Sequence, residues 1–276
     1  MSALPTAAVD FGVNRVGLTQ LRRHWRPDDA PWAAALVVHG LNEHSGRYEH
    51  VGRSLAGAGI EAIAFDQRGF GQTGGERGYI DDIDDFCDDV EDQLAEVRRL
   101  GLPTVLIGHS MGGLVSTAYA VADRPAPDAL VLSAPALGAD TPAWMPAAAP
   151  VLSRLLPTLR ISSPFDVSVL SRDPAVGAAY EADPLVLPAS TVRLGAALFR
   201  SMTKVVASLD RLRVPTLVLH GLDDRLVPAW ASEPLEGRPG VERRTYTGLR
   251  HELFNEPEGP EIIAGAIAWV HAVLGG

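Results

Sequence analysis

The chain has 276 residues, of which 46% are hydrophobic and 21% charged, and its formal net charge is −10 at pH 7. That length accommodates one α/β core with an insertion, and the composition is that of a globular protein. The negative charge excludes nucleic acid as a partner and argues against anchoring to anionic lipid by charge, whereas neutral lipid and micelle surfaces stay open.

The first residues of the chain contain no basic segment followed by a long apolar run, so we expect no signal peptide. No stretch reaches the length of a membrane-spanning helix. The single cysteine, Cys87, lies in a segment with apolar residues at helical spacing, where buried packing is a better interpretation than a reactive thiol. We therefore expect a cytoplasmic protein.

Strand-like apolar runs recur along the chain, with helical segments between them. After an expected hairpin over residues 9–26 that turns at Asn14, the runs lie at residues 34–40, 60–66, 104–110, 129–135, 216–221 and 241–246. Most are nearly continuous rather than alternating, as in strands that are covered on both faces. This pattern predicts the α/β class, with a mostly parallel central sheet flanked by helices.

The alternation of strands and helices stops over residues 136–209, where prolines interrupt apolar stretches such as VLSRLLPTL and LGAALFRSM. A flexible linker is seldom this apolar, so we interpret the segment as an inserted lid of short helices. The predicted organisation is a core formed by residues 1–135 and 210–276, with a helical lid or cap at residues 136–209.

Three glycines surround a serine in the stretch VLIGHSMGGLV, residues 105–115. The residues before Ser110 predict a buried strand and those after it a helix, so the serine stands at a strand-to-helix turn. A G-x-S-x-G sequence there is typical of a nucleophile elbow, where glycines leave room for the two arms and the helix N-terminus offers N–H groups to a developing negative charge. A simple glycine turn is the alternative, and the context favours the nucleophile.

A serine nucleophile needs a base and a group that orients the base, and in such folds they follow the serine in the order acid, then histidine. The segment after residues 216–221 offers Asp223 and Asp224, and the segment after residues 241–246 offers His251. Both segments follow the carboxyl ends of strands, where α/β sheets place their sites. The other histidines are set aside by position, among them His109 beside the serine and His220 at the end of a strand.

Metal and cofactor sites are not expected. The sequence HELFN at residues 251–255 lacks the second histidine of a zinc-binding H-E-x-x-H sequence. The sequence GFGQTG at residues 69–74 matches the dinucleotide-binding pattern G-x-G-x-x-G, but the residues after it predict a loop instead of a helix. The acidic run DDIDDFCDDVED fits the start and solvent face of a helix better than a calcium loop.

Six motifs occur in order along the chain: HGLNEHSGRY, FDQRGFGQTGG, GHSMGG, LSRDPAVGAAYEADPL, HGLDDRLVP and HELFNEP. With this combination the chain resembles the monoglyceride lipases of the α/β-hydrolase superfamily over residues 36–269. The resemblance implies an α/β-hydrolase fold. It also implies a cytoplasmic or peripheral serine hydrolase that cleaves monoacylglycerols to fatty acid and glycerol without a cofactor.

The resemblance implies roles for individual residues as well. Ser110 would be the nucleophile, Asp224 the acid and His251 the base. The backbone N–H groups of Leu41 and Met111 would form the oxyanion hole. In that arrangement the histidine takes the serine proton during attack on the ester, while the aspartate holds the imidazole in the correct tautomer.

Recognition of the glycerol end of the substrate is implied only in part. Glu43 and Arg47 match the polar residues that the family carries behind the oxyanion loop, and they are the expected substrate-binding residues. Some family members carry a second histidine three residues after the catalytic one, and here that position is Phe254. The stringency of glycerol recognition therefore stays open.

The residues leave further alternatives. A carboxylesterase for small monoesters or a lysophospholipase would use the same chemistry, and a hydrolase-fold ligand receptor with little turnover is an alternative from another class. An apolar stretch in the expected lid is either the lid's own core or an exposed surface that contacts membranes or micelles; it comprises Trp144, Met145, Val151, Leu152, Leu155 and Leu156.

Overall fold

An eight-stranded sheet forms the centre of the computed structural model, which describes residues 6–142, 144–162 and 165–275. The strands lie in the order β1-β2-β4-β3-β5-β6-β9-β10, and from β4 onward they are parallel. Their bounds are β1 Ala8–Val13, β2 Thr19–Trp25, β3 Ala33–Val38, β4 Ile60–Phe65, β5 Thr104–His109, β6 Ala129–Ser133, β9 Thr216–Gly221 and β10 Val241–Tyr246.

The burial of each strand matches how apolar its sequence is. Strands β3, β4, β5, β6 and β9 are buried along their whole length, because helices cover both faces of the sheet. The strands at the two edges, β1 and β10, are largely exposed or half-buried. Strands β1 and β2 form the expected antiparallel hairpin, in which Oδ1 of Asn14 accepts hydrogen bonds from the N–H groups of Val16 and Leu18. The predicted mostly parallel sheet is confirmed.

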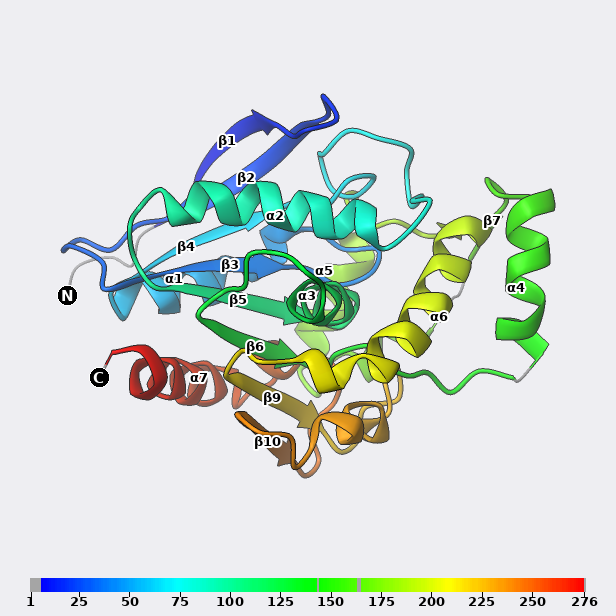
Figure 1. Cartoon of the computed structure of the whole chain (residues 1–276). Helices are drawn as coiled ribbons and strands as arrows, with labels where there is room; N and C mark the ends of the chain where they lie inside the picture. The colour runs from blue at the N-terminus through cyan, green and yellow to red at the C-terminus, as the bar shows by residue number, and fades with distance from the viewer. Residues whose placement is uncertain (1–5, 143, 163–164, 276) are drawn as a thin grey trace.

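Helices cover the two faces of the sheet in pairs (Figure 1). Helices α1 (Glu49–Gly57) and α7 (Gly259–Leu274) share one hydrophobic core with the sheet, and α2 (Asp84–Arg98) and α3 (Met111–Val121) share the other. Cys87 lies buried in α2, and burial raises the pKa of its thiol to about 12. The thiol is thus a packing group, as the helical spacing indicates. Residues 75–81, which follow the GFGQTG sequence, form bends and turns and no helix, as predicted.

The residues between β6 and β9 add no strand to the main sheet within the part of the chain that the structure describes. They form α4 (Trp144–Leu155), α5 (Pro174–Ala182), α6 (Val192–Ala207) and a small sheet of β7 (Arg160–Ile161) with β8 (Ser190–Thr191). Helices α4 and α6 pack together beyond the carboxyl ends of the parallel strands (Figure 1). We call residues 136–209 the inserted segment. Among the described helices, none is both long enough and apolar enough to cross a membrane.

Two helical glycines provide a matched test of packing against the sheet. A Cβ atom at Gly112 of α3 would meet the carbonyl oxygen of Val38, whereas a Cβ atom at Gly195 of α6 would meet nothing within 4 Å. We predict that Gly112→Ala lowers the free energy of unfolding by about 1–3 kcal/mol through overpacking. Gly195→Ala should raise it by about 0.5–1 kcal/mol, because alanine loses less backbone entropy in a helix.

Urea denaturation of the two variants beside the wild type measures both effects. Equal stabilities of the two variants would contradict the close approach of α3 to β3.

Candidate active site

The backbone at Ser110 has an unusual conformation that glycines make possible. Ser110 lies between β5 and α3 with φ of 53° and ψ of −116°, a backbone conformation that residues other than glycine rarely adopt. Its N–H donates to the carbonyl of Ser133 at 2.9 Å, and its own carbonyl accepts from the N–H of Ala136 at 3.0 Å. Side chains at Gly108 or Gly112 would collide with the backbone or side chains around this turn. The turn therefore presents the serine from a fixed backbone.

The structure brings Ser110, His251 and Asp224 together at the carboxyl ends of the strands. Nδ1 of His251 lies 2.7 Å from Oδ2 of Asp224, and both Ser110 and His251 line one cavity of about 250 Å³. Oδ1 of Asp224 accepts hydrogen bonds from the N–H groups of Leu226 and Val227, both at 2.9 Å. The neighbouring Asp223 is exposed. Of the two aspartates that the sequence offers, the structure therefore places Asp224 on the histidine.

The charges of this pair stabilise each other. Burial alone would raise the pKa of Asp224, but the charge of His251 and several hydrogen bonds hold it well below its usual range. Burial alone would lower the pKa of His251, but the charge of Asp224 and its hydrogen bond outweigh burial and raise it. Because Nδ1 faces a carboxylate, it carries the proton, and Nε2 of the neutral ring is left as the base.

His109 lies against the ring of His251, with 4.8 Å between the ring centroids. Its Nδ1 is 3.2 Å from Oγ of Ser133. Burial, together with the nearby charge of His251, lowers the pKa of His109 to about 4. His109 is therefore neutral at pH 7, so it packs beside His251 without adding a second positive charge.

Glu43 is held inside the loop that follows β3. Its Oε1 accepts hydrogen bonds from the N–H of Gly40 at 2.5 Å and from the hydroxyl of Tyr48 at 2.7 Å, and its Oε2 accepts from Arg47 at 2.6 Å. Burial would raise the pKa of Glu43, but the charge of Arg47 outweighs burial and lowers it to about 2. Arg47 also donates to both oxygens of Glu252, at 2.7 and 2.8 Å. Protein groups thus occupy both carboxylate oxygens of Glu43.

The two backbone N–H groups expected to form an oxyanion hole belong to residues that border the same cavity. Leu41 and Met111 both line it. Met111 is the first residue of α3, so its N–H has no acceptor within the helix. Among the described residues, the N–H of Leu41 has no protein acceptor. Both groups are therefore free to receive a negatively charged oxygen.

The cavity has a polar side and an apolar side. Arg47, Glu252 and Tyr180 form one connected polar group, in which the Arg47 guanidinium carbon lies 4.9 Å from the centroid of the Tyr180 ring. The apolar lining comes from α3, from α6 and from the segments after β6 and β9: Leu114, Ala136, Leu198, Met202, Leu226 and Val227. The site can thus receive a molecule with one polar and one apolar end.

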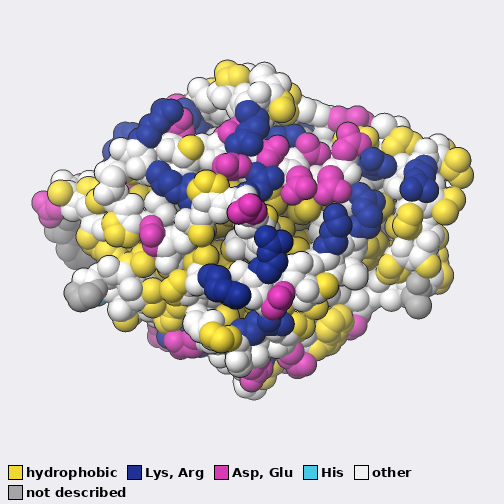
Figure 2. All heavy atoms as spheres, in the orientation of Figure 1, with side chains coloured by type: hydrophobic (Ala, Val, Ile, Leu, Met, Phe, Trp, Pro, Cys, Tyr) yellow, Lys and Arg dark blue, Asp and Glu magenta, His cyan; other side chains and the backbone are white. Residues whose placement is uncertain are grey.

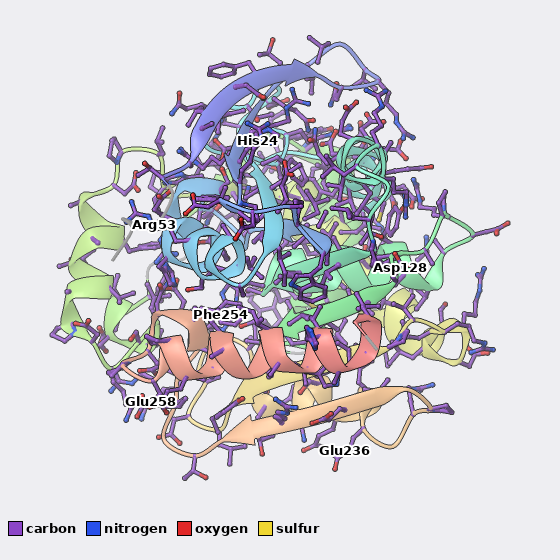
Figure 3. All side chains as sticks on the ribbon, turned by 90° about the vertical axis from the view of Figure 1, so that its left-hand side faces the viewer. His24, Arg53, Asp128, Glu236, Phe254 and Glu258 are labelled. Atoms are coloured by element: carbon purple, nitrogen blue, oxygen red, sulfur yellow. The ribbon has the colours of Figure 1, made fainter. Side chains whose placement is uncertain are left out.

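Phe254 is buried next to α7, as Figure 3 shows, and it lines a second cavity of about 10 Å³. That cavity lies behind the loop after β3, beside Tyr48 and His50, and Phe254 does not line the larger cavity of Ser110. The position where some relatives carry a second histidine therefore adds no polar group to the larger cavity.

Three hydrogen bonds join the loop after β3 to the inserted segment. The carbonyl of Asn42 accepts from the N–H of Leu187 at 2.8 Å, and Oδ1 of Asn42 accepts from the hydroxyl of Ser190 at 2.7 Å. Nε2 of His44 lies 2.8 Å from Oδ2 of Asp183. The inserted segment thus touches the residues on either side of Glu43.

His220 belongs to this site although the sequence argument sets it aside. Its Nε2 lies 2.9 Å from the carbonyl oxygen of Val227 and 3.4 Å from Oδ2 of Asp224, so it faces two acceptors and carries the proton. Its Nδ1 lies 2.9 Å from the hydroxyl of Ser232, which accepts from Arg243 at 2.9 Å. The histidine therefore supports the aspartate from behind. The signal for it in the sequence is its position four residues before Asp224.

The polar chain behind Asp224 continues to the surface. Arg243 donates to Glu236 at 2.9 Å, and Glu236 is labelled near β10 at the margin of the molecule in Figure 3.

Glu252 is a further site residue that sequence reasoning does not single out. Among the described residues, no three His, Cys, Asp or Glu side chains are grouped in a way that could hold a metal ion.

Comparisons with known proteins give consistent matches. A family model, Hydrolase_4, described as serine aminopeptidase S33, matches residues 29–258. The chain is 38% identical to the monoacylglycerol lipase of Mycolicibacterium smegmatis, over 89% of this chain and 90% of that protein. It is 36% identical to the monoglyceride lipase of Homo sapiens, over 92% of this chain and 86% of that protein. The solved structure of Paleococcus ferrophilus monoacylglycerol lipase has a TM-score of 0.83 at 32% identity, covering 91% of this chain and 98% of that chain.

We predict that His220→Phe, which keeps a ring but removes both nitrogens, lowers kcat about ten-fold, since a hydrogen bond to a charged group is worth about 1.5 kcal/mol. Loss of this donor leaves Asp224 a stronger acceptor for His251. The pKa of His251 then rises, and the acidic limb of kcat/KM moves to higher pH. The pH profile of ester hydrolysis measures the shift.

His220→Gln is the control, because its amide can donate near the position of Nε2 and should retain most of kcat. An unshifted acidic limb in His220→Phe would assign His220 to packing alone.

Proposed function

We propose that this chain, which belongs to the Hydrolase_4 family described as serine aminopeptidase S33, is a serine hydrolase. It cleaves monoacylglycerols through an acyl-enzyme on Ser110. The structural match at a TM-score of 0.83 confirms the predicted α/β-hydrolase fold. The observation that carries the proposal is one cavity lined by Ser110 and His251, with polar side chains on one side and apolar side chains on the other. A monoacylglycerol has the same division between a hydroxylated head and an acyl chain.

In the proposed mechanism, Oγ of Ser110 attacks the ester carbonyl carbon while Nε2 of His251 accepts the serine proton. Asp224 keeps the imidazole in the Nδ1–H tautomer and stabilises its positive charge. The N–H groups of Leu41 and Met111 bind the oxyanion, each lowering the barrier by about 3 kcal/mol. Breaking the ester C–O bond releases glycerol, which takes the proton from His251, and water then attacks the acyl-enzyme by the same steps.

The roles that we propose for the polar residues follow from their partners. Glu43 lines the cavity with Arg47, and Gly40, Tyr48 and Arg47 hold its carboxylate in place, so we assign Glu43 both to holding the loop after β3 and to the polar side of the cavity that receives glycerol. Arg47 lines the cavity and presents its guanidinium beside Tyr180. We assign Arg47 to the hydroxyl groups of the leaving glycerol. The apolar wall formed from α3 and α6 receives the acyl chain.

The inserted segment is proposed as a lid that contacts the lipid phase. It supplies Phe165, Tyr180, Leu198 and Met202 to the cavity, so it covers the reacting groups. Its outer helix α4 and the residue after it leave large apolar side chains exposed, which favours a surface for membranes or micelles over an internal core of the lid: Trp144, Val151, Leu152, Leu155 and Leu156. A lipid substrate dissolved in such a phase would enter the cavity from that side.

The substrate proposal predicts that monoolein is cleaved with a kcat/KM at least about ten-fold above those of diolein and triolein, which carry the same acyl chain. The reason is that a site built around hydroxyl groups penalises esters that lack them. Release of fatty acid in one detergent measures the three rates. Equal or faster cleavage of triolein would overturn the monoester assignment.

Ser110→Ala is the control for the chemistry, with an expected loss of about a million-fold in kcat at unchanged thermal stability. A variant that keeps a tenth of the wild-type rate would overturn the nucleophile assignment. Loss of labelling by a fluorophosphonate probe in this variant separates a working hydrolase from a ligand receptor.

The lid proposal predicts that replacing Leu152 and Leu156 with serine weakens partition onto phosphatidylcholine vesicles about ten-fold, because less apolar area enters the lipid. Activity on a soluble short-chain ester should be retained. Replacing Val16 and Leu100, which are exposed elsewhere, with serine gives the matched control. Unchanged partition of the lid variant would contradict lipid contact through α4.

A further inference from the structure

Two stretches of the inserted segment contain basic residues and no acidic ones. Residues 144–161 and 190–207, which include α4, β7, β8 and α6, contain four arginines and the only lysine but no aspartate or glutamate. They carry a formal charge of +5 in a chain whose net charge is −10. Composition alone therefore hides a basic region, since an overall charge says nothing about how charges are distributed.

Only some of these cations are neutralised by nearby carboxylates. Arg193 forms an ion pair with Asp81 at 3.1 Å, and Arg200 lies 3.7 Å from Asp82. Arg154, Arg160 and Lys204 are exposed, and they form no ion pair with any carboxylate among the described residues. These three cations are available to charges outside the protein.

The unpaired cations adjoin the exposed apolar side chains. Arg154 and Arg160 stand on either side of three exposed leucines, which are 71%, 49% and 48% exposed: Leu155, Leu156 and Leu159. Figure 2 shows Lys and Arg side chains next to hydrophobic ones over the end of the molecule formed by α4 and α6. An apolar surface bordered by cations is the pattern of a protein segment that lies in the headgroup region of a bilayer.

The two helices of this surface, α4 and α6, also line a groove next to the cavity of Ser110. An open groove of about 500 Å³ is lined by Pro146 of α4 and by Phe199 and Val206 of α6. The groove and the cavity of Ser110 share Gly138, Ala139 and Met202 in their linings. A lipid leaving a bilayer at this surface would therefore meet a groove whose lining adjoins that of the cavity of Ser110.

We propose that α4, β7 and α6 form a docking surface for lipid bilayers with anionic headgroups, on which Arg154, Arg160 and Lys204 bind lipid phosphates while the leucines enter the interface. The proposal rests on the proposed function only in taking the substrate from a lipid phase. Each basic residue near an anionic membrane gains about 1 kcal/mol, which is about five-fold in partition. Three unpaired cations therefore give about a hundred-fold preference for anionic over neutral vesicles. The preference should fall as salt screens the charges.

The test measures co-sedimentation of the full chain with phosphatidylcholine vesicles and with vesicles that also contain phosphatidylglycerol. The test variant replaces Arg154, Arg160 and Lys204 with glutamine. A matched variant replaces Arg26, Arg99 and Arg211 with glutamine and so makes the same change in net charge. These three arginines are exposed at the opposite end of the parallel strands. Activity on a soluble short-chain ester verifies that both variants are folded.

We expect the wild type and the matched variant to prefer the phosphatidylglycerol vesicles strongly, and the test variant to bind both vesicles about equally. Equal binding of the wild type to both vesicles would overturn the proposal, as would an equal loss in the two variants or a test variant that keeps the preference. Sedimentation requires no turnover. A protein that cleaves no monoacylglycerol but still prefers the anionic vesicles would refute the proposed function and leave the docking surface intact.

Discussion

The arrangement of the site depends on one buried group of charges, Glu43, Arg47 and Glu252. The arginine lies between the two carboxylates with contacts of 2.6 to 2.8 Å. Glu43 belongs to the loop after β3, and Glu252 follows His251 in the loop after β10. The group therefore ties the backbone of the expected oxyanion hole to the backbone of the base. Loss of one member would leave a buried charge unpaired, which costs about 3–5 kcal/mol in proteins.

Local rules of chain geometry predict most of the fold and the positions of Ser110 and His251, whereas the choice of Asp224 over Asp223 comes from the resemblance to the monoglyceride lipases. Five buried strands are recognised because helices on both faces demand continuous apolar runs. The glycines around Ser110 are recognisable in the sequence because the close approach of α3 to β3 leaves no room for side chains there. Asp224 and His251 follow strand ends in the expected order, and parallel strands bring their carboxyl ends to one edge. Each of these features depends on residues that are near one another in sequence or on the topology of the sheet.

The remaining features depend on contacts between distant residues, which no local pattern records. Oδ2 of Asp224 has a second neighbour in His220 only because the loop after β9 folds back on its own strand. The sequence indicates that Glu43 is a polar residue of the site, but not that Gly40 and Tyr48 already occupy its carboxylate. Likewise, the net charge of −10 that argues against anchoring to anionic lipid is a sum over the sequence, and it cannot indicate that Arg154, Arg160 and Lys204 lie exposed without a carboxylate partner among the described residues.

The hydrogen bonds that Asn42 accepts from Leu187 and Ser190 connect the inserted segment to the loop after β3, which contains Leu41 of the expected oxyanion hole. Asn42 directly follows Leu41, which lines the cavity of Ser110. The position of the segment and the position of that N–H group are therefore linked in free energy. A surface that bound one placement of the segment more tightly would, through these bonds, favour the matching placement of the loop. By reciprocity, a ligand that fixes the loop strengthens binding to that surface by the same factor.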